Sequence, residues 1–478
     1  MRYLIGIDIG TSGTKTVLFD TDGNVVKSKT VEYLLYQPHN GWAEQNPEDW
    51  WNAARETLEY VGTENVVGIG LSGQMHGLVM LDEKGGVIRP SIIWCDGRTA
   101  AECEEITEKV GRDRLIEISA NPALAGFTAS KIMWVKKHEP ENYAKCRHIL
   151  LPKDYIRYRL TGEFATDVSD ASGMQLLDVK NRVWSEEIAK KLGIDTALLP
   201  KLHESTEVSG YYHGIPVAAG GGDNACAAVG CGVVSPGKAF TTVGTSGVVY
   251  AHTDRPIIDK AGRVHTFCCA VPGKWHVMGV TQAAGLSLKR FRENFAGDIT
   301  YREMDDAAKS VPPGAEGLIY LPYLMGERTP HLDPDARGVF FGISAIHERK
   351  HFIRAVMEGV AYSLRDCLEV LREMRIPVDG MLAVGGGAKS ELWCKIMAGV
   401  YGMPLHTFKS NEGAALGAAI LGGVAANVYP TVEAACEKLC KASQVQKVEN
   451  TEKYDRVYSV YKSLYPSVKD IYKSLKEL

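Results

Sequence analysis

The sequence Gly-Thr-Ser-Gly occurs twice in this chain of 478 residues, at positions 10–13 and 244–247. Each copy lies between two short runs of apolar and β-branched residues, a pattern that predicts a strand, a turn and a second strand. The copies are about half the chain length apart, and a chain this long is expected to form two domains. The repeat therefore predicts two similar α/β domains that face each other across a cleft.

Strand patterns alternate with helical patterns along the whole chain, as in an α/β fold. A new strand begins near residue 215, so we predict an N-terminal domain at 1–218, a C-terminal domain at 219–445 and a helical tail at 446–478. The tail carries tyrosines at 454, 458, 461 and 465, on one face, which favours packing against a domain. Whether that domain is the first or the second stays open. Other predicted elements are strands at 3–9, 14–19, 66–71 and 381–387, and helices at 46–60, 128–138 and 390–400.

The composition argues against several classes of function. With 23% charged residues and a formal net charge of −4, the chain lacks the basic surface that nucleic acids require. An acid follows too soon after the amino terminus for a signal peptide. The longest apolar stretch, 413–426, is too short for a membrane span and predicts a buried helix. The 11 cysteines form no CxxC pair, so neither a zinc site nor a disulfide framework is expected, and the cytoplasm is the predicted location.

The repeated turns are chemically suited to hold phosphates. Closely spaced backbone N–H groups, glycines and the hydroxyls of Thr11-Ser12 and Thr245-Ser246 would form a phosphate cradle. One such turn alone would more often be an ordinary hairpin, but two copies half a chain apart favour the phosphate hypothesis. Asp8 stands inside an apolar strand just before the first turn, where an unpaired carboxylate is unfavourable. Hydrated Mg²⁺ on a nucleotide would be a natural partner.

Asp223 follows three glycines, 220–222, and precedes a helix of small residues. It could simply cap that helix. Alternatively, the glycines leave room for a ligand hydroxyl to reach the carboxylate, which could accept its proton during phosphoryl transfer. Position alone does not separate these interpretations, and the nearby turn at Thr245 favours the catalytic one.

Candidate ligand-binding residues follow two further buried strands, where open α/β sheets bind ligands. These residues are Gln74, Met75 and His76 after one strand, and Trp94 and Asp96 after the other. A lone histidine is more often structural, and Asp96 could form a local ion pair with Arg98 in a turn.

Glycine-rich segments elsewhere give weaker signals. The run 385–387 would let a flat or phosphate-bearing ligand lie against the backbone. Residues 232–238 match GxxxxGK, but Ala239 stands where a P-loop needs Ser or Thr. Residues 68–73 match GxGxxG, but no phosphate-binding helix follows directly. Both of these matches are rejected.

The chain resembles the FGGY carbohydrate kinases, within the actin, hexokinase and Hsp70 superfamily. Two long patterns carry the resemblance: Gly126-Phe127-Thr128 with Lys131, Trp134 and His138, and Gly338 to Ile343 continuing to Glu358. The segments 74–77, 151–155, 222–224 and 326–330 look particularly like those of the xylulokinase branch. The resemblance implies two duplicated ribonuclease H-like domains flanking a deep cleft.

The resemblance also implies roles for individual residues. Asp223 would be the base that accepts the proton of the sugar C5 hydroxyl, and Asp8 would organise Mg²⁺ through water. The product would be D-xylulose 5-phosphate with ADP. On the sugar side the implied residues are Gln74, Met75, His76, Trp94, Asp96 and Asn224; on the ATP side they are Thr11, Ser12, Thr245, Ser246, Gly285, Gly387 and Ala388.

Three alternatives stay open at this stage. The first is a kinase of the same family acting on ribulose, gluconate or glycerol, against which Gln74-Met75-His76 argues. The others are an ATP-binding chaperone or filament protein of the same fold, and an inactive family member that senses sugar; neither needs both Asp8 and Asp223. The predicted partners are a small sugar and ATP, with a homodimer as a candidate assembly and with neither nucleic acid nor a membrane.

Overall fold

Two mixed sheets with the same strand order form the framework of the protein in a computed structural model, which describes residues 2–408 and 412–475. The strands of the first sheet run in the order β13-β14-β5-β1-β2-β3, and β15 also pairs with β5. Its strands are β1 (Tyr3–Ile9), β2 (Gly13–Asp20), β3 (Val25–Glu32), β5 (Val66–Gly73), β13 (Val208–Tyr212), β14 (Ile215–Ala218) and β15 (Gly221–Gly222). The second sheet, in the order β18-β19-β17-β16-β22-β23-β24, consists of β16 (Gly237–Val243), β17 (Gly247–Thr253), β18 (His265–Cys268), β19 (Trp275–Thr281), β22 (Val378–Val384), β23 (Leu405–Phe408) and β24 (Ala442–Gln446).

Strand directions repeat from one sheet to the other. The hairpin β1–β2 is antiparallel and β1 pairs in parallel with β5. Likewise, β16–β17 is an antiparallel hairpin and β16 pairs in parallel with β22. Each Gly-Thr-Ser-Gly turn connects the first two strands of its own sheet, at 10–13 and 244–247. The duplicated α/β organisation predicted from the repeat is confirmed.

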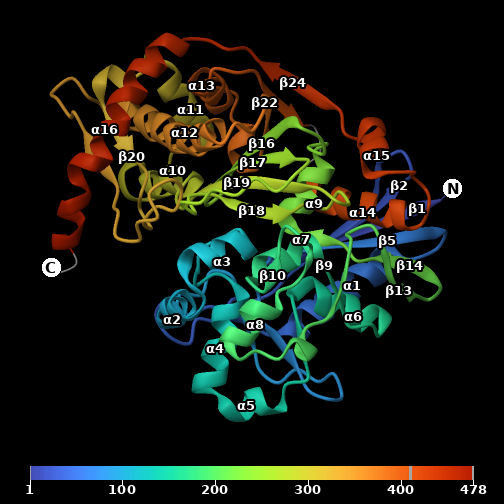
Figure 1. The fold of residues 1–478 in the computed structure, drawn as a ribbon. Helices are drawn as coiled ribbons and strands as arrows, with labels where there is room; N and C mark the ends of the chain where they lie inside the picture. Colours follow the sequence, from blue (N-terminus) through green and yellow to red (C-terminus); the bar gives the residue numbers. More distant parts are fainter. Residues whose placement is uncertain (1, 409–411, 476–478) are drawn as a thin grey trace.

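Helices cover the sheets and fill the space between them (Figure 1). In the first half of the chain they are α1 (Pro47–Val61), α2 (Ala100–Val110), α3 (Arg112–Ser119), α4 (Thr128–His138), α5 (Pro140–Lys145), α6 (Pro152–Thr161), α7 (Val168–Ala171), α8 (Glu186–Leu192) and α9 (Asp223–Gly230). In the second half they are α10 (Gly285–Phe291), α11 (Tyr301–Lys309), α12 (Arg349–Glu373), α13 (Glu391–Tyr401), α14 (Gly413–Ala425), α15 (Val432–Leu439) and α16 (Thr451–Leu475). Short strand pairs complete the fold: β4 (Glu44–Gln45) with β7 (Ser91–Ile92), β6 (Val79–Leu81) with β8 (His148–Leu150), β9 (Ala165–Asp167) with β12 (Lys201–His203), β10 (Leu177–Asp178) with β11 (Val183–Trp184), and β20 (Ile319–Leu321) with β21 (Val339–Phe341).

Local signals account for several of these elements. Helix α1 begins as predicted, because the Asn46 side chain accepts a hydrogen bond from Glu48 N at 3.1 Å and Pro47 occupies the first helical position. The apolar segment 413–425 forms α14, which is largely buried. Over the described residues, no helix is long and apolar enough to cross a membrane.

Each of the two sheets defines a lobe, and one helix crosses from the second lobe to the first. Helix α14 follows β23 of the second sheet in the chain, yet it packs on β1 and β5 of the first. Helix α9 begins directly after β15 of the first sheet, and its Ala228 belongs to an apolar cluster that includes Phe240, Val248 and Tyr250 of the second sheet. The two helices also pack against each other, and Figure 1 shows them between the sheets. The order of segments in space therefore differs from their order in the chain, and the division at 218 and 445 stays a prediction.

The tail packs on the second lobe, which answers the question that the sequence left open. Between α15 and the long helix α16, the chain adds β24 to the edge of the second sheet, a strand that was not predicted from the sequence. Tyrosine hydroxyls of α16 then bond to that lobe: Tyr454 with Arg354 at 2.6 Å, Tyr458 with Asp366 at 2.6 Å, Tyr461 with Tyr323 at 3.1 Å and Tyr465 with Asp333 at 2.8 Å. Residues 476–478 of the predicted tail lie outside the described residues.

We expect Gly70→Ala to destabilise the fold by at least about 3 kcal/mol, because overpacking against a backbone cannot relax by side-chain rotation. A Cβ on Gly70 in β5 would lie 1.8 Å from Ala418 O in α14. Urea unfolding followed by tryptophan fluorescence measures the change. The matched control is Gly380→Ala in β22, whose Cβ would meet only the His406 ring at 3.7 Å. Equal stability of the two variants would contradict the close packing of α14 on β5.

Candidate active site

Asp8 and Asp223 lie near each other at the carboxyl-terminal ends of the parallel strands of the first sheet. We call this side of the sheet the carboxyl edge. Strands β1, β5 and β15 run in parallel, and both Asp8 and Gly221 are register partners of Ser72. Ser72 Oγ donates to Asp8 Oδ1 at 2.8 Å. Asp223 begins α9 immediately after β15. Two carboxyl groups that are far apart in the sequence therefore lie at the ends of the two strands that flank β5 at one edge of the sheet.

Burial and mutual repulsion set the charge of this carboxyl pair. Burial raises the pKa of Asp8, while the hydrogen bond from Ser72 opposes the rise. Burial, and then the Asp8 carboxylate, raise the pKa of Asp223 to about 7. Asn224 limits that rise because its backbone N and Nδ2 donate to Asp223 Oδ1 at 2.7 and 3.0 Å. A carboxyl group that titrates near neutrality can exchange a proton with a substrate at physiological pH.

The first Gly-Thr-Ser-Gly turn is braced from several sides. Gly10 N donates to Gly13 O at 3.0 Å, which closes the turn. Trp94 Nε1 donates to Thr11 Oγ1 at 2.9 Å, and Ser12 is exposed. Lys15, the register partner of Asp8 on β2, forms an ion pair with Glu412 at 2.5 Å just before α14. The turn is thereby connected to the helix that crosses from the other lobe.

The second turn is closed in the same way and is joined to α10. Gly244 N donates to Ser246 O at 3.0 Å, and Ala284 N donates to Thr245 O at 2.9 Å. Gly285 N donates to Gly244 O at 2.7 Å, and a Cβ on Gly285 would lie 2.5 Å from that same oxygen. Glycine at 285 is therefore required by the contact between turn and helix.

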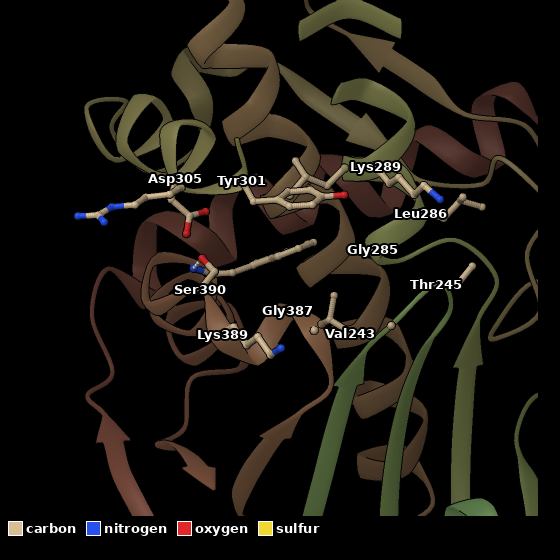
Figure 2. Close-up of a pocket in the computed structure, with 15 residues that line it drawn as sticks. Val243, Thr245, Gly285, Leu286, Lys289, Tyr301, Asp305, Gly387, Lys389 and Ser390 are labelled. Atoms are coloured by element: carbon tan, nitrogen blue, oxygen red, sulfur yellow. Dashed lines mark hydrogen bonds between the residues drawn. The ribbon is translucent and has the colours of Figure 1, made fainter. Parts of the chain in front are cut away.

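A cavity of about 690 Å³ begins at the second turn. In Figure 2, Tyr301 and Asp305 of α11 lie on one side of the open space, and Lys389 and Ser390 lie on the other. The cavity is lined by Val243, Gly244, Thr245, Gly285, Leu286, Leu288, Lys289, Tyr301, Arg302, Asp305, Gly386, Gly387, Lys389, Ser390 and Trp393. Its size and its mixture of apolar and polar walls are those of a small-ligand site.

Three of the residues predicted for the ATP side, Thr245, Gly285 and Gly387, line this cavity. Ala388 follows Gly387 in the chain and packs partly against the core of the second lobe. The predictions missed the walls contributed by α11 and by Trp393. The sequence does carry a local signal for α11, since Thr300 and Glu303 form a capping box at its start. Nothing local shows that α11 faces the glycine run at 385–387.

His76 is held as a neutral imidazole. Burial and the nearby Lys131 ammonium lower the pKa of His76 to about 3. His76 Nδ1 lies 2.9 Å from Gly173 O, and because a carbonyl only accepts, Nδ1 carries the proton. Nε2 is then free of a proton and can accept a hydrogen bond from a ligand hydroxyl. Lys131 Nζ donates to His76 O at 2.9 Å and so fixes the backbone of this residue.

The other residues predicted for the sugar side fall into two groups. Trp94 is exposed, Asn224 is partly exposed, and Met75 is buried against Gly222, whose Cβ would lie 2.8 Å from Met75 Cγ. Gln74 and Asp96 are buried, and their polar atoms bond to the chain itself. Gln74 Nε2 donates to Gln45 Oε1 at 2.8 Å, and Asp96 pairs with Arg98 at 2.6 Å and accepts from Ala43 N at 2.6 Å. Direct contact of these two residues with a substrate stays a prediction.

Phe127 lies between His76 and two residues of the second lobe, His265 and Arg328. The rings of His76 and Phe127 are 4.8 Å apart between centroids, and those of Phe127 and His265 are 5.8 Å apart. Arg328 lies 3.5 Å from His265 Nε2 and is partly exposed. Over the described residues, no carboxylate lies within ion-pair distance of this guanidinium. Arg328 belongs to the family-like segment 326–330, and its proximity to His76 is a tertiary contact that the sequence does not reveal.

A repeated sheet topology with a Gly-Thr-Ser-Gly turn between the first two strands of each sheet defines a duplicated, two-lobed α/β protein. Family models agree: the N-terminal domain of the FGGY family of carbohydrate kinases matches residues 3–230, and the C-terminal domain of that family matches residues 239–426. The chain belongs to the FGGY family of carbohydrate kinases and is a sugar kinase. The predicted family and fold class are confirmed.

Individual relatives extend the likeness over the whole chain. The chain is 40% identical to a xylulose kinase of Bacillus subtilis, strain 168, over 100% of this chain and 99% of the relative. It is 32% identical to a gluconokinase of the same strain, covering 94% and 93% of the two chains. The crystal structure of a xyloylose kinase from Brucella ovis superposes with a TM-score of 0.94 at 35% identity, covering 98% of this chain and 100% of that one.

We expect Asp8→Asn to lower the pKa of Asp223 from about 7, because the Asp8 carboxylate disfavours a second negative charge nearby. A ¹³C NMR titration of the carboxyl carbons in metal-free protein measures the midpoint, and Asp223→Asn assigns the signal. The control is Asp22→Asn, on the exposed β2–β3 turn, which should leave the midpoint in place. An unchanged midpoint in Asp8→Asn would show that Asp8 does not act on Asp223.

Proposed function

We propose that this kinase transfers the γ-phosphoryl group of ATP to the C5 hydroxyl of D-xylulose, giving D-xylulose 5-phosphate and ADP. The observation that carries the proposal is the carboxyl group of Asp223, whose pKa of about 7 is set by burial and by Asp8. A relative of nearly the same length and 40% identity is named a xylulose kinase, which supports this substrate.

Asp223 is the proposed general base. In its ionised form it accepts the proton of the C5 hydroxyl while the hydroxyl oxygen attacks the γ-phosphorus and ADP departs. The pKa near 7 keeps a large share of the carboxyl ionised at neutral pH while leaving it basic enough to accept the proton. Asn224 holds Oδ1 with two hydrogen bonds, so Oδ2 is the atom we assign to the incoming proton.

The two turns are the proposed phosphate sites, and the cavity is the proposed nucleoside site. Thr11-Ser12 and Thr245-Ser246 offer hydroxyls and backbone N–H groups, and Thr245 lies where the second turn meets the cavity. Gly285, Gly387 and Ala388 form the glycine-lined side of that cavity in this proposal. A volume of about 690 Å³ accommodates a ligand of nucleoside size.

The carboxyl pair also fits a divalent cation. Asp8 and Asp223 repel each other, as the raised pKa of Asp223 indicates, and a cation would relieve that repulsion. Over the described residues, no three histidine, cysteine or carboxyl side chains form a metal cluster. We therefore propose that Asp8 holds hydrated Mg²⁺ through water. When bound with the nucleotide, this ion neutralises charge on the phosphates.

On the sugar side we propose that His76 Nε2 accepts a hydrogen bond from a sugar hydroxyl and that Met75, Trp94 and Asn224 complete the surface. Gln74 and Asp96 support this surface from beneath, because both are buried and bonded to neighbouring loops. The predicted homodimer and the cytoplasmic location remain predictions.

Gluconate is the second candidate substrate. The Arg328 guanidinium beside His265 is a cation that a substrate carboxylate could neutralise, and a relative at 32% identity is named a gluconokinase. D-xylulose has no carboxylate, so the two candidates differ in the charge that they present to Arg328.

A coupled ADP-release assay with Mg-ATP and a panel of sugars tests the proposed substrate. The panel contains D-xylulose, ribulose, gluconate, glycerol and a sugar-free control. We expect the highest kcat/KM with D-xylulose, because the chain is more similar to the xylulose kinase than to the gluconokinase. Preferential turnover of gluconate would indicate that Arg328 binds the substrate carboxylate. ADP release that does not depend on sugar would contradict sugar phosphorylation.

We expect Asp223→Asn to lower kcat by about 10²- to 10⁴-fold, the usual contribution of a general base, with nucleotide affinity retained. Steady-state kinetics and calorimetric titration with ATP measure the two quantities. Asp113→Asn, a change at a fully exposed carboxylate of α3, is the control and should leave both unchanged. Turnover of Asp223→Asn close to that of the unaltered protein would remove the proposed base.

A further inference from the structure

A cluster of buried ions lies directly behind the carboxyl edge that carries Asp8 and Asp223. It consists of Lys153, Asp154 and Arg157 from α6, Asp167 at the end of β9 and Asp170 from α7, and the side chains are all fully buried. Lys153 Nζ lies 2.6 Å from Asp154 Oδ1, 2.9 Å from Asp167 Oδ1 and 3.3 Å from Asp170 Oδ2. We call these five residues the buried ion cluster.

The charges of the buried ion cluster are nearly balanced. Burial, together with the neighbouring Asp154 and Asp167, raises the pKa of Asp170 well above its usual range, which favours its uncharged form. Two cations, Lys153 and Arg157, face the three carboxyl groups of the cluster. Even balanced, a buried ion pair often stabilises a fold less than apolar side chains of the same volume would. The cluster therefore calls for an explanation other than stability.

A continuous chain of contacts leads from the buried ion cluster to the residue before Asp223. Asp167 Oδ2 accepts hydrogen bonds from Ser169 Oγ at 2.5 Å, from Ser169 N at 2.8 Å and from Ser205 Oγ at 2.8 Å. Because the Ser169 hydroxyl donates to Asp167, its oxygen lone pairs face away from the cluster. One of them accepts a hydrogen bond from Gly222 N at 3.2 Å.

Gly221 and Gly222, which precede Asp223, have no side chains that could pack and hold their backbone in place. Neighbouring residues must therefore hold it. A Cβ on Gly221 would lie 3.1 Å from Ser169 Oγ, and one on Gly222 would lie 2.8 Å from Met75 Cγ. The strand β15 is thus enclosed by α7 on one side and by Met75 on the other. On its third side, Gly221 and Gly222 pair with Ser72 and Gly73 of β5.

The buried ion cluster also supports β5 at the same level. A Cβ on Gly73 would lie 2.9 Å from Lys153 Cβ, and Gly73 is the register partner of Gly222. Lys153 therefore contacts one strand of the carboxyl edge by packing, and the same side chain reaches the next strand through Asp167 and Ser169. A shift of this chain of contacts would move the Gly222 peptide and turn the Asp223 side chain that follows it.

We propose that Ser169 is a positioning residue for Asp223, acting through the hydrogen bond that its hydroxyl accepts from the Gly222 peptide. The buried ion cluster serves to fix the direction of that hydroxyl. This inference rests on the proposed role of Asp223 as the base that accepts the sugar proton.

The test compares Ser169→Ala with two neighbouring serine variants in the sugar kinase assay. We expect Ser169→Ala to lower kcat by about 10- to 100-fold with little change in the KM values for sugar and ATP, because misplacement of a catalytic group affects the chemical step. Amide hydrogen exchange of the segment around Gly222 should accelerate in the same variant, since its peptide loses its acceptor.

Two controls separate positioning from general loss of stability. Ser172→Ala removes an equally buried hydroxyl of the same segment, which donates to Val168 O and accepts from Cys268 N. Ser205→Ala removes a donor to Asp167 but leaves the bond between Ser169 and Gly222. Both should keep kcat within about threefold of the unaltered protein. If Ser169→Ala does not fold, Ser169→Cys replaces it, because a thiol of similar shape is only a weak hydrogen-bonding group.

The outcomes distinguish this inference from the proposed function. If Asp223→Asn is inactive while folded Ser169→Ala keeps kcat within about threefold, the inference is wrong and the base assignment stands. An equal fall of kcat in Ser172→Ala or Ser205→Ala would also overturn it. Full activity of Asp223→Asn would instead remove the base itself, whatever Ser169→Ala does.

Discussion

Helices α9 and α14 cross with their backbones in contact, because glycines occupy the crossing point. A Cβ on Gly230 would lie 1.8 Å from Gly413 O, and one on Gly417 would lie 1.9 Å from Cys226 O. Helix α14 continues the chain of the second lobe and packs on the sheet of the first, whereas α9 follows the first sheet and packs on α14. Since Asp223 begins α9 and α14 covers the strand that carries Asp8, this crossing fixes both the arrangement of the lobes and the place of the carboxyl pair.

Burial shifts the pKa values of the ionisable groups at the carboxyl edge towards their uncharged forms. Two carboxyl groups, Asp8 and Asp223, are desolvated beside each other, so the protein holds one of them near the protonation state that proton transfer requires. His76 is desolvated as well, and it stays neutral and presents an acceptor nitrogen. Behind them, the buried ion cluster packs against Gly73 of β5 and is connected through Ser169 to the Gly222 peptide. Burial thus shifts the pKa values of the candidate site residues on one side of the edge, while buried contacts hold their backbone on the other.

Local patterns predicted much of the fold and singled out the residues of the candidate site. The repeated turn predicted two similar halves, and Asn46-Pro47 predicted the start of α1. Patterns of this kind succeed because hydrogen bonds and steric limits act between neighbours in the chain. Residues such as Tyr301, Asp305 and Arg328 could not be assigned in this way, because their positions depend on how distant helices pack. The strand β24 was missed for the same reason, since it exists only by pairing with β23.

The sequence by itself determined the family, the duplicated α/β framework and the two aspartates, because turn geometry, strand periodicity and family motifs are written in contiguous residues. Only the tertiary structure decided that α14 returns to the first sheet, that the tail packs on the second lobe, and that Gln74 and Asp96 are buried and bonded within the chain. Only the tertiary structure also connected Lys153 to Gly222 through Asp167 and Ser169. Contacts of this kind depend on the close packing of segments that are far apart in the chain, and no local sequence pattern shows which distant segments will meet.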